Sequence, residues 1–234
     1  MLDFLRRRFR RMRVETLKPA TAAGPRGVRF VVGDRNRDMA LAMAAAFRDL
    51  ACVEVVCGDL LDLSPDAVVC PGNSFGDMGG GFDKAVDDFH RGAAQPLVAQ
   101  AIGDRCCGEL AVGAALVVEV PGARAVRCLV MAPTMRVPGN QAQSIGAYLA
   151  TRAALVAVLQ HNVRGGAPIV SVAIPGMVTG VGGMPFAESA AQMRTAFASI
   201  VEEKWRQVAH PAMAPYALRG VQGPAAGRAP RGGA

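Results

Sequence analysis

Residues 66–83 read DAVVCPGNSFGDMGGGFD, and this stretch decides the fold. It opens with an apolar run, Ala67 to Cys70, in which apolar and polar residues do not alternate. Such a run is typical of a strand that is buried on both faces of a sheet. Three consecutive glycines then precede a helical stretch from about Phe82 to Phe89. The pattern predicts a buried strand, a glycine loop and a helix, in that order.

A second copy of this order lies nearer the C-terminus, where residues 172–183 read VAIPGMVTGVGG. The run from Pro168 to Ile174 predicts a strand, Pro175 to Pro185 predicts a glycine loop, and a final helix is expected from Phe186 to about Gln207. Proline and glycine at the end of each apolar run are the usual signals that a strand stops and a loop begins.

Strands and helices alternate along the rest of the chain, which predicts an α/β fold with a largely parallel sheet covered on both faces. Asp38 is the expected cap of the first helix, which runs to about Leu50. The other expected strands are 28–32, 53–57, 116–120 and 126–132, and the other expected helices are 96–103 and 141–162.

Three of the predicted strands end alike, at Pro71-Gly72, at Pro133 and at Pro175-Gly176. In open α/β sheets the loops that leave the carboxyl ends of the strands gather at one edge, and ligands bind there. We therefore expect the following residues to converge at this edge: Asn73, Gly79, Gly80, Gly81, Thr134, Gly180, Val181, Gly182 and Gly183.

Glycine loops that run into helices suit phosphate, because backbone N–H groups approach the anion without interference from a Cβ. Two such loops at one edge could hold the two phosphates of a diphosphate, although each could also be only a flexible turn. The chain has no G-x-x-x-x-G-K-[ST] motif, which excludes a P-loop. Pro185 stands where the dinucleotide fingerprint needs a third glycine, which excludes that motif as well.

The net charge of +7 is concentrated at the two ends of the chain. Residues 1–29 contribute +7, residues 211–234 add three arginines and no acid, and residues 30–210 carry −3. A basic face on the folded domain is therefore not indicated, and a nucleic-acid partner would have to bind the ends. Residues 1–27 read as a basic extension, either disordered or forming a short amphipathic helix, and the tail at 209–234 is rich in proline, glycine, alanine and arginine and is expected to be disordered.

The six cysteines form no C-x-x-C pair and have no metal-site spacing to the three histidines, so no metal site is expected. Several lie inside apolar runs, where cysteine acts as a small apolar residue, and we interpret all six as reduced thiols of a cytoplasmic protein. No apolar run is long enough for a membrane span.

Taken together, the motifs resemble the macrodomain family, whose members bind ADP-ribose. The resemblance rests on Cys57-Gly58-Asp59-Leu60, on residues 66–74 and 79–83, and on residues 172–183, and it covers about residues 53–200. It implies a three-layer α/β/α sandwich with a mixed, mostly parallel central sheet. The domain would span 28–208, with 28–50 as an added N-terminal strand and helix.

The resemblance also implies roles for individual residues. Asp59 would accept a hydrogen bond from the adenine amino group, with Leu60 beside it, and Asn73 would contact the distal ribose. Asp59 could equally cap its own turn, and Asn73 could close an Asx-turn. The diphosphate would lie between Gly79, Gly80, Gly81 and Phe82 on one side and Thr179, Gly180, Val181, Gly182 and Gly183 on the other.

Asp83 is the implied catalytic residue, together with Asn73. In hydrolytic members of the family an aspartate at this position helps to activate a water at the distal ribose, which releases ADP-ribose. An aspartate in the first turn of a helix also stabilises that helix without any catalysis. The chain departs from the family at Cys70, where an asparagine is usual, and at Phe82, where a small aliphatic residue is usual. No aromatic lid over the nucleotide is evident, and Phe75, Phe186 and Tyr148 are the candidates.

Three functions stay open at this point. The chain could hydrolyse ADP-ribosylated macromolecules or O-acetyl-ADP-ribose, it could bind ADP-ribose without chemistry, or it could associate with nucleic acid through its basic ends. None of these functions needs a metal or a redox cofactor.

Overall fold

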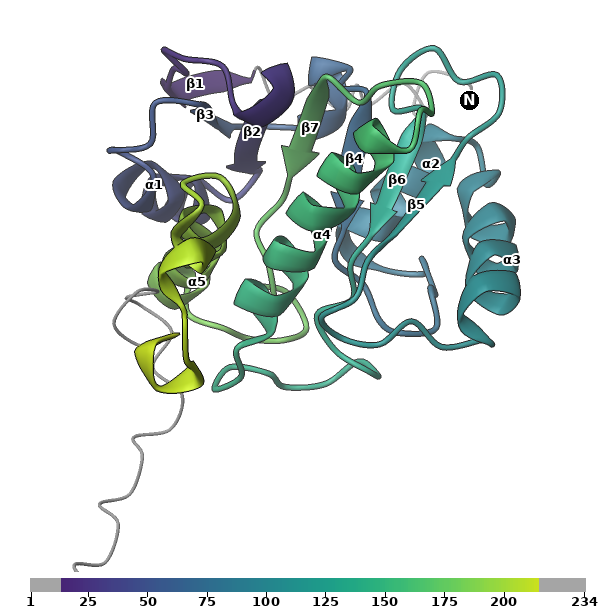
Figure 1. The fold of residues 1–234 in the computed structure, drawn as a ribbon. Helices are drawn as coiled ribbons and strands as arrows, with labels where there is room; N and C mark the ends of the chain where they lie inside the picture. The colour runs from purple at the N-terminus through teal and green to yellow at the C-terminus, as the bar shows by residue number, and fades with distance from the viewer. Residues whose placement is uncertain (1–13, 215–234) are drawn as a thin grey trace, which may run out of the picture.

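The computed structural model describes residues 14–214, which form one seven-stranded mixed sheet flanked by helices (Figure 1). The strand order is β1-β3-β2-β7-β4-β6-β5. The pairs among β3, β2, β7, β4 and β6 are parallel, whereas β1 and β5 pair antiparallel at the two edges. The strands are β1 (Glu15–Lys18), β2 (Arg29–Asp34), β3 (Val53–Cys57), β4 (Ala67–Cys70), β5 (Leu116–Glu119), β6 (Cys128–Met131) and β7 (Ser171–Ile174).

Helices cover both faces of the sheet, which gives the expected three-layer α/β/α sandwich. One face packs against α1 (Arg37–Ala46), α4 (Gly146–Val163) and α5 (Phe186–Ile200), and its core includes Phe47 and Phe197, whose rings meet edge to face at 5.0 Å. The other face packs against α2 (Gly81–Phe89) and α3 (Ala94–Cys106). All four residues of β4 are buried, as expected for a strand covered on both sides.

Several elements differ from the sequence prediction. Residues 15–18 do not belong to a free extension, because they form β1, which pairs with β3. The first helix is capped by Asn36 rather than Asp38, since the Asn36 side chain accepts hydrogen bonds from the N–H groups of Asp38 and Met39. The last helix ends at Ile200, and Glu203 adopts a left-handed conformation before a short 3-10 turn at Lys204–Gln207.

The strand at 29–34 is also more than an addition to the domain. It lies in the interior of the sheet between β3 and β7, with Phe30 paired to both Val53 and Val172. Removing it would split the sheet, so residues 28–50 are an integral part of the fold.

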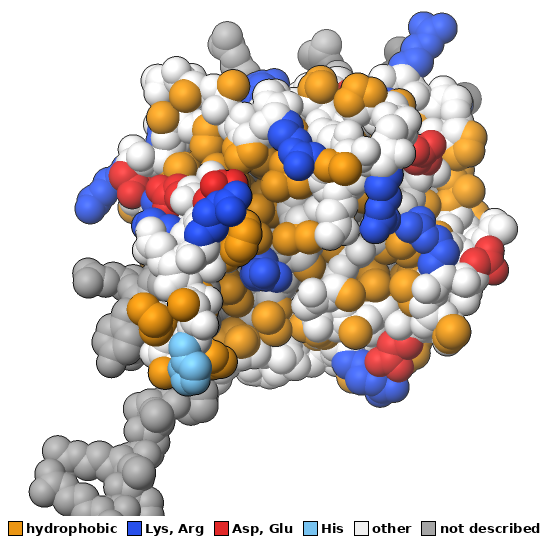
Figure 2. Space-filling model, in the orientation of Figure 1, with side chains coloured by type: hydrophobic (Ala, Val, Ile, Leu, Met, Phe, Trp, Pro, Cys, Tyr) orange, Lys and Arg blue, Asp and Glu red, His pale blue; other side chains and the backbone are white. Residues whose placement is uncertain are grey.

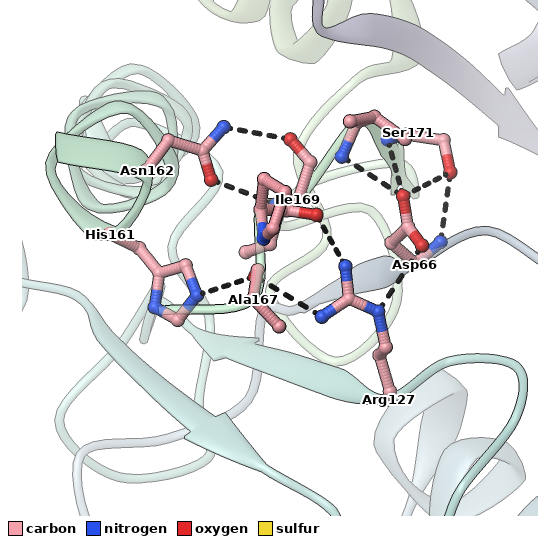
Figure 3. A network of polar contacts seen from close by, with 9 residues as sticks. Asp66, Arg127, His161, Asn162, Ala167, Ile169 and Ser171 are labelled. Carbon is pink, nitrogen blue, oxygen red and sulfur yellow. Dashed lines mark hydrogen bonds and ion pairs between the residues drawn. The ribbon is translucent and has the colours of Figure 1, made fainter. Parts of the chain in front are cut away.

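Asp66 links the amino ends of three central strands, β4, β6 and β7 (Figure 3). Its Oδ2 atom accepts hydrogen bonds from the backbone N–H groups of Val170 and Ser171, both at 2.9 Å, and its Oδ1 atom pairs with Arg127 Nε at 3.3 Å. Arg127 in turn donates to the backbone carbonyl oxygens of Ala167 and Pro168. This network joins β4, β6 and β7, which are not adjacent in the sequence.

The surface of the described part of the chain carries charges of both signs. Figure 2 shows that lysine and arginine side chains on the face covered by α4 and α5 are separated by apolar and uncharged surface, and several lie beside acidic side chains. No helix within residues 14–214 is both long and apolar enough to cross a membrane. All six cysteines are free thiols.

Candidate functional site

A cavity of about 510 Å³ opens at the carboxyl ends of the five parallel strands. Each of these strands contributes the residues that follow it, which is the arrangement expected of a ligand site in an α/β sheet. These segments are 33–36 at the end of β2 and just beyond it, 58–60 after β3, 71–73 after β4, 134–135 after β6 and 175–176 after β7. The two glycine loops complete the wall.

The first glycine loop leads into α2. Gly80 is the N-cap of this helix, and Gly81 has φ of 60°, a conformation that favours glycine. Asp77 Oδ1 accepts a hydrogen bond from the Gly79 N–H at 3.0 Å, which holds the loop in place. Within residues 14–214 no acceptor bonds to the N–H groups of Gly80, Gly81 and Phe82, which lie at the positive end of the helix dipole.

The second glycine loop is closed on itself by two hydrogen bonds. Met184 N–H donates to Val178 O, and Gly183 N–H donates to Gly180 O, both at 3.0 Å. The N–H groups of Gly180, Val181 and Gly182 have no acceptor in the described part of the chain. The two loops therefore present unpaired amides to the same cavity, which is what an anion-binding site requires.

Glycine is needed for different reasons within the second loop. A Cβ on Gly182 would lie 2.6 Å from the carbonyl oxygen of Val178, so the protein itself demands glycine there. A Cβ on Gly180 would meet no atom of the described residues within 4 Å. Gly180 thus leaves open space along the cavity wall, where a bound molecule could approach the backbone closely.

Two predicted site residues do not line the cavity, although they shape the loops that do. Gly79 stands behind Gly80 with its N–H bonded to Asp77, and Gly183 turns the second loop with φ of 66°. The other predicted residues, Asp59, Leu60, Asn73, Gly80, Gly81, Phe82, Asp83, Thr179, Gly180, Val181 and Gly182, are brought together around the cavity.

Asn73 organises the loop that follows β4. Its Oδ1 atom accepts a hydrogen bond from the Phe75 N–H at 3.0 Å, which makes the Asx-turn that the sequence left open, and its Nδ2 atom donates to Asp77 O at 3.2 Å. The side chain is buried but still reaches the cavity wall. Because an amide nitrogen carries two hydrogens, one donor remains for a ligand.

Asp83 lies in the first turn of α2, with only 3% of its surface exposed and with neither carboxylate oxygen in a hydrogen bond of normal geometry. Burial raises the pKa of Asp83 to about 7; the Gly72 backbone N–H beside it lowers the pKa in part, and the charge of Asp77 raises it further. A Cβ on Gly72 would overlap Asp83 Oδ2, so glycine at 72 makes room for this carboxylate. Burial, and then the Asp83 charge, also raise the pKa of the Cys70 thiol.

Asp59 does cap its own turn, since Oδ1 accepts a hydrogen bond from the Leu61 N–H at 3.1 Å. Its other oxygen forms an ion pair with Arg35. Arg35, together with Asp34 and Asn36, lies in the loop between β2 and α1 and lines the cavity. This loop was not among the predicted site residues. It follows the predicted strand at 28–32, however, so the strand-end rule that identified Asn73 also applies to it.

The cavity wall carries few positive charges. Arg35 is the one cationic side chain among its described residues, against the aspartates Asp34, Asp59, Asp77 and Asp83. An anion would therefore bind mainly to backbone amides. No group of three or more His, Cys, Asp or Glu side chains within the described residues is arranged to hold a metal ion.

The candidate aromatic lids differ in position. Phe186, the first residue of α5, lines the cavity, whereas Phe75 and Tyr148 do not. Phe75 is exposed on the surface, where the Arg136 guanidinium lies over its ring at 5.3 Å.

The family model of the macro domain matches residues 69–193, which include both glycine loops. The chain belongs to the macro domain family. An uncharacterized protein of Aeropyrum pernix is 34% identical to this macro domain over 166 residues, which make up 70% of this chain and 80% of that protein. An uncharacterized protein of Aquifex aeolicus is 32% identical over 133 residues, 57% of this chain and 73% of that protein.

Solved structures of other macro domains share this fold at lower identity. The macrodomain of Mycobacterium tuberculosis DarG has a TM-score of 0.51 at 21% identity and covers 62% of this chain and 88% of its own. The Oceanobacillus iheyensis macrodomain with ADP has a TM-score of 0.53 at 22% identity, with 64% and 76% covered. Thermosipho africanus DarTG in complex with ADP-ribose has a TM-score of 0.50 at 18% identity, with 62% and 38% covered.

Proposed function

We propose that this macro domain binds ADP-ribose in the cavity at the strand ends. The observation that carries the proposal is the pair of glycine loops whose unpaired amides, from Gly80 to Phe82 and from Gly180 to Gly182, face one cavity. A diphosphate placed between them would satisfy amides that no protein group satisfies, and the dipole of α2 would favour its charge. Thermosipho africanus DarTG, which shares the fold, is in complex with ADP-ribose.

The placement of the rest of the ligand follows from the polar groups on either side. Asp59 and Leu60 stand at the end of β3, where adenine would bind, and Asn73 stands at the end of β4, where the distal ribose would bind. Asp59 keeps acceptor capacity for an amino group, because a carboxylate has about four lone-pair sites and the side chain uses two.

Calorimetric titration with ADP-ribose tests the proposal. We expect saturable one-to-one binding, and weak binding of ribose 5-phosphate, which lacks both the base and the diphosphate. No heat of binding at about 1 mM ADP-ribose, a concentration that detects interactions of only about 4 kcal/mol, would contradict the proposal.

Hydrolysis of ADP-ribosyl linkages is the second function, and Asp83 favours it. A buried carboxyl group with a pKa of about 7 is suited to accept a proton at neutral pH. In the proposed step, water attacks C1″ of the distal ribose and Asp83 takes its proton. The bond from C1″ to the modified group then breaks, and the leaving group keeps the bonding electrons and takes a proton. With O-acetyl-ADP-ribose the water instead attacks the acetyl carbonyl carbon, and the ester bond between that carbon and the ribose oxygen breaks. Acetate is released, and the ribose oxygen keeps the bonding electrons and takes a proton.

Asp83→Ala separates hydrolysis from binding alone. We expect the variant to bind ADP-ribose and to lose release of ADP-ribose from ADP-ribosylated protein or from O-acetyl-ADP-ribose. Asp104→Ala is the matched control, because it removes an exposed carboxylate on α3, outside the cavity. If wild type and Asp83→Ala both bind and neither turns over substrate, the protein reads ADP-ribose without chemistry.

A nucleic-acid partner has no support in the described part of the chain. Residues 14–214 carry a net charge of −1, and nine of the eleven arginines in the basic ends (1–29 and 211–234) lie in residues 1–13 and 215–234, outside the described residues. We place the protein in a reducing compartment such as the cytoplasm, which the six free thiols favour.

A further inference from the structure

Arg35 lines the cavity, and the residues before and after it fix its backbone. Asp34 Oδ1 accepts a hydrogen bond from the Asn36 N–H at 2.7 Å, and the Asn36 side chain caps α1. The backbone around Arg35 is thus fixed by its neighbours, while its own side chain is 62% exposed and lines the cavity.

The Arg35 guanidinium is tied to the end of the cavity where β3 stops. It pairs with Asp59 Oδ2, and Asp59 is anchored by its bond to the Leu61 N–H. Exposed ion pairs of this kind contribute little to stability. The pair holds the planar Arg35 guanidinium beside the Asp59 carboxylate.

The loops after β2 and β3 contribute no aromatic side chain to the cavity wall. Among the described residues that line the cavity, the aromatic ones are Phe82 in α2 and Phe186 in α5, and neither lies in the loops after β2 or β3. The guanidinium group of arginine is planar and can stack on the face of an aromatic ring. The ammonium group of lysine has no flat surface and cannot stack in this way.

We propose that Arg35 determines specificity for a purine base, with its guanidinium held by Asp59 and stacked on the face of the ring. The proposal rests on the proposed binding of ADP-ribose and assigns one part of that site. Arg35 and Asp59 both precede residues 69–193, so this contact comes from a part of the chain that the family model does not match.

Titration of Arg35 variants with ADP-ribose and with ribose 5-phosphate tests the stacking. We expect Arg35→Ala to weaken binding of ADP-ribose about fivefold to twentyfold, in line with a desolvated cation–π contact, and to leave the weak binding of ribose 5-phosphate unchanged. Arg35→Lys should not restore affinity, because it keeps the charge and loses the plane, whereas Arg35→Trp should restore most of it.

Arg37→Ala is the matched control, since Arg37 is also exposed and ion-paired, with Glu15, but does not line the cavity. Both alanine variants should keep their Tm within about 2 °C. Wild-type affinity in Arg35→Ala would overturn the proposal and mean that Arg35 does not contact the ligand. If Arg35→Ala loses affinity equally for ADP-ribose and for ribose 5-phosphate, and Arg35→Lys restores it fully, Arg35 binds phosphate and does not stack on the base. Failure of the wild-type protein to bind ADP-ribose would instead refute the proposed function itself.

Discussion

Asp83 combines two properties at the scale of a single residue. It is buried without a hydrogen-bond partner of normal geometry, and it lines the cavity. A carboxyl group in this situation costs the folded state free energy whenever it is ionised. A neutral side chain of similar shape at this position would avoid that cost.

The raised pKa of Asp83 gives stability a definite pH dependence. Because the folded state binds the proton up to about pH 7 and the unfolded chain only up to about pH 4, the free energy of unfolding should fall as pH rises between these values. Asp83→Asn should remove this decline and stabilise the protein at pH 8 by roughly 2–4 kcal/mol, with Asp77 and Cys70 as the other titratable groups nearby. Urea unfolding at pH 4 and pH 8 measures the effect, and an equal difference between variant and wild type at both pH values would contradict it.

Gly180 and Gly182 should respond differently to the same substitution. A Cβ at 180 enters open space on the cavity wall, so Gly180→Ala should keep the stability of wild type and weaken ADP-ribose binding by about tenfold. A Cβ at 182 meets the Val178 carbonyl oxygen, so Gly182→Ala should cost roughly 1–3 kcal/mol of stability. Thermal unfolding and calorimetry on both variants check the contrast, which fails if Gly180→Ala binds as tightly as wild type.

At the scale of elements, the carboxyl ends and the amino ends of the central strands differ in structure. The carboxyl ends form the cavity, and the amino ends are joined by the network around Asp66 (Figure 3). At the amino ends, the hydrogen-bonded carboxylate of Asp66 links β4, β6 and β7.

Asp66→Ala should destabilise the fold by roughly 2–4 kcal/mol, since it leaves the Val170 and Ser171 N–H groups and Arg127 without their acceptor. Burial raises the pKa of Asp66, but the hydrogen bonds from Val170 and Ser171 and the charge of Arg127 outweigh it and hold the pKa below its usual value. The stabilisation is therefore present above about pH 4 and lost as pH falls below it.

Urea unfolding of Asp66→Ala at pH 7 and pH 3 tests both statements. Ser171→Ala, which removes one hydroxyl from the same network, should show a smaller loss of about 1 kcal/mol. A loss in Asp66→Ala that is as large at pH 3 as at pH 7 would mean that the carboxylate form is not what stabilises the strands.

At the scale of the whole molecule, the sheet extends to β1, on the N-terminal side of the expected domain boundary at residue 28. Lys18 Nζ donates to the carbonyl oxygens of Leu50 at 2.9 Å and Val53 at 2.5 Å, which ties β1 to the turn before β3. Deleting residues 1–27 should lower Tm by about 5–10 °C relative to a truncated protein that begins at Val14, because the longer deletion removes β1 and the Lys18 contacts. Equal Tm values for the two truncated proteins would show that β1 adds nothing to stability.

Local signals were sufficient to predict much of the fold and of the cavity. The unalternating run at 67–70 and the glycine loops at 79–81 and 180–183 have signatures within a few residues of each other, because strand burial and turn geometry are local properties. The rule that strand ends share one edge then predicted that Asn73 and both loops would meet, which the structure confirms.

The amino-acid sequence was enough to predict the α/β class, the two glycine loops and the position of Asp83 at the start of a helix. The tertiary structure alone decided that residues 29–34 lie inside the sheet, that β1 covers β3, and that Arg35 reaches Asp59. These facts depend on pairing between segments that are far apart along the chain, and no pattern within one segment reports which partner it will meet. The burial that raises the pKa of Asp83 has the same origin, because the atoms that exclude water come from several strands and loops.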